Sequence, residues 1–202
     1  MKDTAIDWLA GRWVACALFM ACALLLFAPV VFVGLTQALF LLFLHSPAYM
    51  LHQVEEHTHD RFRRFANHYL FHGLDGLTTR AVLVINLPIV WGLNLGAFYA
   101  GWLLGAGWGL AAPYCLVVNA LAHVGASARL RVYDPGLVTS ILIFLPLGLL
   151  TIATIAALPG VGFAAHATGL GIALGIHVAI VVSTLRHFRE LGRPGAATAP
   201  AE

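Results

Sequence analysis

Charged residues are scarce in this sequence. Only 10% of its 202 residues are Asp, Glu, Lys or Arg and 60% are hydrophobic, whereas soluble domains contain about 25% charged residues. This deficit argues against a soluble protein and predicts an integral membrane protein in contact with the lipid bilayer. The formal net charge of +2 is also too small to indicate a nucleic-acid-binding protein, so no nucleic acid is expected as a partner.

Cysteine is equally rare. Cys16, Cys22 and Cys115 all lie inside apolar runs, and none belongs to a CxxC or CxxH motif. This spacing argues against both a disulfide framework and a metal site made of thiolates. The three cysteines are therefore interpreted as small packing residues.

The sequence instead contains long apolar runs. Each of six segments approaches the ~20 residues that a helix needs to cross the hydrocarbon core. The chain is predicted to be all-α, a polytopic transmembrane helical bundle of about six spans that forms a single domain over residues 1–190, followed by a disordered tail over 191–202. The predicted spans are 13–32, 35–57, 79–103, 107–130, 135–158 and 166–188.

The basic residues are distributed on one side of this topology. If the N-terminus is cytoplasmic, all 11 Lys and Arg residues lie at the cytoplasmic ends of the six spans. The opposite loops, near Gly34 and Gly105 and at residues 159–165, contain none. By the positive-inside rule, this partition predicts that the N- and C-termini are both in the cytoplasm.

The stretch LHQVEEHTHD, residues 51–60, follows the apolar half of the predicted second span and contains three of the nine acidic residues. If the helix continues to His59, then His52, Glu55, Glu56 and His59 share one face at ~100° per residue. The direction of His57 differs from that of His52 by about 140°, so His57 is left out of the predicted site. Because ionisable groups are costly against lipid, this face is expected to turn inward.

A second polar group lies near the end of the predicted fourth span. Asn119 and His123 are four residues apart, and the segment RVYDPGLV follows them. The topology brings this segment to the same membrane level as residues 51–60. Tyr133 is interpreted as a hydrogen-bond or proton donor, or else as an interfacial anchor. Pro135 and Gly136 are expected to shape the start of the fifth span.

Three segments in this order resemble the HXXEE family of multi-pass membrane proteins: HQVEE at residues 52–56, the histidine His123, and YDPG at residues 133–136. The resemblance extends over about residues 13–189. It implies a largely bacterial group, and therefore a multi-pass protein of the bacterial inner membrane. It also implies that the motif residues act together, but it indicates no reaction. Asn119, His57 and His59 lie outside the family motifs.

Imidazole and carboxylate groups on one inward face are typical of a metal site for zinc or iron. The same residues are also compatible with a solvated helix end that forms salt bridges with nearby arginines. We predict a divalent metal as cofactor, with Asn119, Pro135 and Gly136 in supporting positions and Glu55, Glu56 and Tyr133 as catalytic candidates. The predicted ligands are His52, Glu55, Glu56, His123 and, least firmly, His59.

These residues favour an integral membrane enzyme that acts on a lipid or isoprenoid-like hydrophobic substrate. Iron would indicate an oxidoreductase, and zinc a hydrolase in which a glutamate acts as general base. Two alternatives stay open: a metal-free glutamate acid in the same cavity and a proton- or metal-coupled transporter. Against transport, few ionisable groups occur deeper in the spans. The oligomeric state is left open.

Overall fold

The computed structural model describes residues 4–192, and in this range every regular element is a helix. The predicted all-α bundle is confirmed. Most of the predicted tail, residues 193–202, lies outside the described residues, as does Lys2. The longer helices are α2 (Trp13–Gly34), α3 (Gln37–His57), α6 (Gly92–Leu104), α7 (Ala111–Leu130), α9 (Leu145–Ala156) and α10 (Phe163–Leu191).

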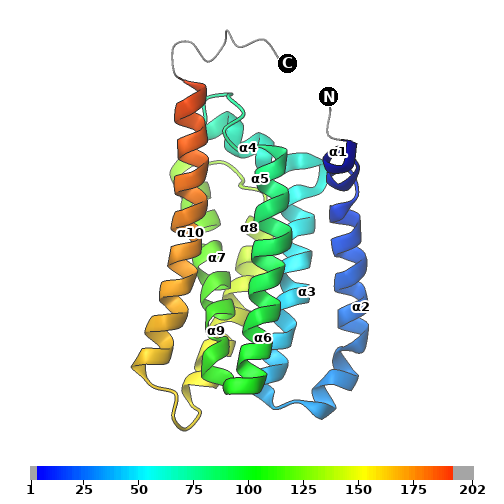
Figure 1. Cartoon of the computed structure of the whole chain (residues 1–202), viewed down its shortest axis with the longest axis vertical. Helices are drawn as coiled ribbons and strands as arrows, with labels where there is room; N and C mark the ends of the chain where they lie inside the picture. The colour runs from blue at the N-terminus through cyan, green and yellow to red at the C-terminus, as the bar shows by residue number, and fades with distance from the viewer. Residues whose placement is uncertain (1–3, 193–202) are drawn as a thin grey trace.

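The other helical elements are short. Helices α1 (Thr4–Ala10) and α4 (Arg61–Tyr69) lie at one end of the bundle, the upper end in Figure 1, which we call the α4 end. The remaining elements are η1 (Thr58–Asp60), α5 (Thr79–Val84), η2 (Ile85–Trp91), η3 (Ala106–Gly109), α8 (Leu137–Thr139) and η4 (Ser140–Phe144).

Five stretches of helix are long and apolar enough to cross a membrane: 13–34, 79–104, 106–130, 137–156 and 163–191. They agree within a few residues with five of the six predicted spans. The other predicted span corresponds to α3, whose second half is too polar to belong to this group. Its 21 residues nevertheless reach about 31 Å, the thickness of the hydrocarbon core.

Helix α3 is the central helix of the bundle. Of its 21 residues 12 are buried, whereas α2 buries four of 22 and α10 two of 29. Figure 1 shows α2 and α10 at the two flanks of the bundle. Many of their apolar side chains are exposed. Helix α3 runs without interruption through Pro47. Its polar second half is therefore surrounded by other helices rather than by lipid.

Two of the spans contain a π-helical segment. Pro88 lies inside η2, where it cannot donate a backbone hydrogen bond, and the backbone widens at this point. Asn86 in η2 and Phe144 in η4 are both buried, and both contact side chains of α3. The two widened turns therefore supply part of the environment of the polar half of α3.

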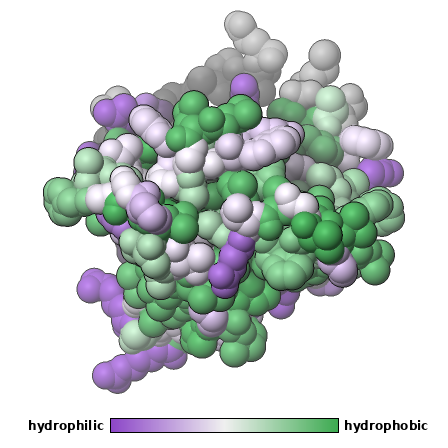
Figure 2. All heavy atoms as spheres, turned by 90° about the horizontal axis from the view of Figure 1, so that it is seen from below, coloured by the Kyte–Doolittle hydropathy of each residue, from purple (hydrophilic) through white to green (hydrophobic). Residues whose placement is uncertain are grey.

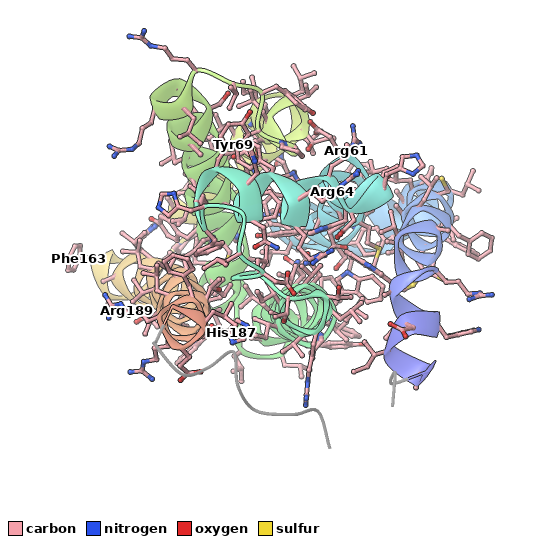
Figure 3. The ribbon with its side chains drawn as sticks, turned by 90° about the horizontal axis from the view of Figure 1, so that it is seen from above. Arg61, Arg64, Tyr69, Phe163, His187 and Arg189 are labelled. Carbon is pink, nitrogen blue, oxygen red and sulfur yellow. The ribbon has the colours of Figure 1, made fainter. Side chains whose placement is uncertain are left out.

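The two ends of the bundle differ in polarity. Figure 3 looks onto the α4 end and shows Arg61, Arg64 and Arg189 there. Figure 2 looks onto the opposite end, whose surface is mainly hydrophobic. The loops between α2 and α3 and between α9 and α10 contain no Lys or Arg. The separation of basic residues that was predicted from the sequence is thus visible in the described chain.

Candidate metal centre

Helices α3 and α7 bring two histidines and a glutamate together near the α4 end. His52, Glu56 and His123 are buried, and each offers one ligand atom within 4.8 Å of the others. The distance from Glu56 to His52 Nε2 is 3.5 Å, and that from Glu56 to His123 Nε2 is 3.8 Å. A tetrahedral metal with bonds of about 2.0–2.1 Å holds its ligand atoms about 3.4 Å apart. The two distances from Glu56 to the histidine nitrogens are close to that value.

The other ring nitrogen of each histidine lies close to an oxygen atom, and for His52 the contact is a hydrogen bond. His52 Nδ1 lies 2.8 Å from the hydroxyl of Thr139, and His123 Nδ1 lies 3.2 Å from Asp134 Oδ2. The Thr139 hydroxyl donates its proton to Glu55, so it must accept a hydrogen bond from His52. His52 therefore carries its proton on Nδ1. Supporting contacts of this kind orient metal-binding histidines in proteins.

As a result, a lone pair of His52 and the Glu56 carboxylate face each other, although both are hydrogen-bond acceptors. With the His52 proton on Nδ1, its Nε2 lone pair faces the Glu56 carboxylate, and His123 Nε2 lies 3.8 Å from the same carboxylate. His52 Nε2 is buried and has no hydrogen-bond partner among the described residues. An unsatisfied buried acceptor costs about 1–3 kcal/mol. A divalent cation fits this donor set, because two imidazoles and one carboxylate are typical ligands of zinc and of non-haem iron.

Gly136 holds the two imidazoles in place from one side. Its φ angle is +106°, and a Cβ atom there would lie 2.8 Å from Cε1 of both His52 and His123. Only glycine combines this backbone conformation with so close an approach. The Phe144 ring packs on His52 at a centroid distance of 4.3 Å, and Phe62 lies 5.5 Å from His123. The group is therefore enclosed by aromatic rings and by one glycine.

Glu55 points away from this group, toward the start of α8. Its carboxylate accepts hydrogen bonds from the backbone N–H groups of Val138, at 3.0 Å, and Thr139, at 2.7 Å. It thus serves as an N-cap supplied by another helix, where a negative charge is also favoured. Glu55 was predicted as a ligand and a catalytic residue, and the structure leaves it outside the three-residue group.

Tyr133 and Asp134 lie in the loop before α8. Tyr133 is 49% exposed, and its hydroxyl donates a hydrogen bond to Glu55. Burial and this bond raise the pKa of Tyr133 to about 12. Asp134 is buried; burial raises the pKa of its carboxyl group, and the contact with His123 opposes that rise. Tyr133 therefore supports the cap, and Asp134 supports His123.

Two further predicted residues also lie outside the group. Helix α3 ends at His57, and His59 has a φ angle of +57°, so the helical extension on which its prediction rested is absent. His59 is exposed. Asn119 is half-buried, and its Oδ1 has no hydrogen-bond partner among the described residues. Pro135 is buried directly before Gly136.

Sequence reasoning missed His57. The helical wheel points it away from His52, yet its Nε2 atom lies 3.0 Å from Glu56 Oε2 and 3.1 Å from Asn86 Nδ2. Asn86 accepts a hydrogen bond from Gln53, which accepts one from Trp91. Neighbouring residues on a helix can meet through long side chains, and a wheel does not show this. No sequence signal pointed to Asn86.

Comparison with protein families gives one match. Residues 43–151, more than half of the chain, match the model of a family described as proteins of unknown function with an HXXEE motif. The chain belongs to the HXXEE family. No curated protein and no solved structure matches it. The match includes the motif residues 52–56, His123 and Gly136, so the predicted family is confirmed.

Proposed function

We propose that this HXXEE protein is an integral membrane metalloenzyme that uses zinc or iron(II). The observation that carries the proposal is the convergence of His52, Glu56 and His123, which are all buried and each offer one ligand atom within 4.8 Å of the others. These three residues would hold the metal. Thr139 and Asp134 orient the two histidines through their Nδ1 atoms.

A metal held in this way would supply a Lewis acid that activates water or, for iron, oxygen chemistry. The residues around it exclude bulk water, since Phe144 is fully buried and Gly136 closes one side. The site lies within a bundle whose outer surface is apolar. We therefore propose a lipid or isoprenoid-like substrate that reaches the site from the bilayer. The α4 end, with its arginines, is proposed to face the cytoplasm.

One observation favours a second candidate, a metal-free acid–base site. His57 Nε2 lies 3.0 Å from Glu56 Oε2, close enough for the two side chains to share a proton without a metal. In that case Glu56 and His57 form a buried proton-donating pair. The Nε2 acceptor of His52, which has no hydrogen-bond partner among the described residues, is left unexplained by this alternative, which is why the metal site is preferred.

The proposal is tested by elemental analysis of protein purified in mild detergent without chelators. We expect one equivalent of zinc or iron in the parent and in the control His177→Ala, since His177 lies on α10 and hydrogen-bonds its own helix. His52→Ala and Glu56→Ala should lose the metal. Glu55→Gln should retain it, because Glu55 lies outside the group.

Two results contradict the metal site. The first is a parent that holds no metal after purification and after incubation with zinc or iron(II), which would support the metal-free alternative. The second is an equal loss of metal from His177→Ala and Glu56→Ala, which would place the metal elsewhere on the chain. Circular dichroism of each variant separates loss of metal from loss of fold.

A further inference from the structure

A groove with a volume of about 570 Å³ runs between α10 and the span formed by α5 and η2. Helix α10 packs mainly against α7, so its opposite side is free to border this groove. At the α4 end, the Phe188 ring of α10 contacts Phe71 at a centroid distance of 5.2 Å. Most of the wall is apolar and comprises Val84, Ile85, Ile89, Ile176, Ala179 and Ile180.

The groove is polar at one end only. Helix α5 begins and α10 ends at the α4 end, so Arg80 and His187 meet at the same level. Figure 3 shows His187 on the side of α10 that faces α5. From Arg80 to Ile89 the wall extends over ten residues, a rise of about 13 Å along a helix. The groove therefore has a basic mouth and an apolar interior.

Arg80 has no ion pair and no side-chain hydrogen bond among residues 4–192. Arg63, at the same end of the bundle, is bound by Asp60 at 2.6 Å and by Asp75 at 2.8 Å. No acidic residue lines the groove. The hydroxyls of Ser183 and Thr184 already donate to a backbone carbonyl of α10. Within the described part of the chain, the Arg80 guanidinium at the mouth of the groove therefore has no partner.

We propose that this groove binds a membrane phospholipid with an anionic headgroup. An acyl chain matches the apolar wall, and the headgroup phosphate matches Arg80, because guanidinium binds phosphate through paired hydrogen bonds. Basic residues at the membrane surface also attract anionic lipids in general. His187 adds a ring nitrogen on the opposite wall. The groove shares no lining residue with the candidate metal centre, so this site is independent of the metal.

The experiment is native mass spectrometry of the detergent-purified protein with added phosphatidylglycerol or phosphatidylcholine of identical acyl chains. The parent should retain phosphatidylglycerol in preference. Arg80→Gln should weaken this binding about fivefold, the effect of one basic residue near a membrane surface. Arg129→Gln is the matched control, because Arg129 lies in the last turn of α7 and does not line the groove.

A second variant tests the apolar interior of the groove. Ile180→Trp fills the groove and should reduce the binding of both lipids, while the metal content stays that of the parent. Equal retention of the two lipids by the parent would overturn the proposal. So would an equal effect of Arg80→Gln and Arg129→Gln, or a protein dimer that Ile180→Trp disrupts, since a second copy would then occupy the groove.

Discussion

Gly136→Ala tests whether the contact between the YDPG segment and the two histidines matters energetically. The φ angle at Gly136 is +106°, and the new Cβ would lie 2.8 Å from Cε1 of His52 and His123 and 3.1 Å from His123 Nε2. Backbone strain of this kind costs about 1–3 kcal/mol. Overpacking against rigid rings costs about 1–3 kcal/mol more. The expected loss is thus about 2–6 kcal/mol.

The assay is thermal unfolding in detergent, combined with metal analysis. A loss of this size should lower Tm by at least about 4 °C in a domain of this length. The metal content should fall as well, because the alanine methyl group displaces both ring planes. The matched control is Gly125→Ala in α7, where a Cβ meets nothing within 4 Å. That change should be neutral, or stabilising by about 0.5–1 kcal/mol.

An unchanged Tm and metal content for Gly136→Ala would refute the reasoning, since it would mean that Gly136 is not pressed against the imidazoles. Equal destabilisation by Gly125→Ala would also refute it, because the effect would then follow from any added methyl group. Only opposite behaviour of the two glycines supports the geometry described here.

Two further predictions concern the residues that support the site. Thr139→Val removes the partner of His52 Nδ1 and should weaken metal binding about 10–100-fold in a chelator competition. Thr151→Val is the control and should leave metal binding unchanged, because Thr151 is buried and hydrogen-bonds Leu147 of its own helix. Because the pKa of Tyr133 is raised to about 12 from 10.0, the stabilisation that its neutral form provides is complete below pH 10 and is lost as the pH rises through about 12. In an ultraviolet titration, the phenol signal absent from Tyr133→Phe should therefore ionise near pH 12, and a midpoint near pH 10 would contradict the bond to Glu55.

The fold was predictable because the membrane imposes it. Backbone groups in lipid must bond within their own segment, so each apolar run of about 20 residues has to be a helix. The π-helical turns were not predictable in the same way. Pro88 marks one of them, but Pro47 lies in a helix that continues as an α-helix. Whether a proline widens a helix depends on its tertiary neighbours.

Part of the candidate site was predictable from the spacing of residues along a helix. His52 and Glu56 are four residues apart and face the same way, and His123 reaches them because α7 packs beside α3. The wheel could not distinguish Glu55 from Glu56, since both lie within about 60° of His52. What separates them is the position of α8, which offers Glu55 two backbone donors. Likewise, the prediction for His59 assumed that α3 continues through this residue, whereas His59 has a left-handed backbone conformation.

The HXXEE motif and the YDPG segment therefore form one physical unit rather than two separate signatures. Glu55 fixes the start of α8 by capping it, and this places Thr139 against His52 Nδ1. The same turn places Gly136 against both imidazoles. Glu56, the adjacent residue, is thereby left free to face the two Nε2 atoms. The two consecutive glutamates thus make different contacts: Glu55 binds the loop that contacts the histidines, and Glu56 faces the histidines themselves.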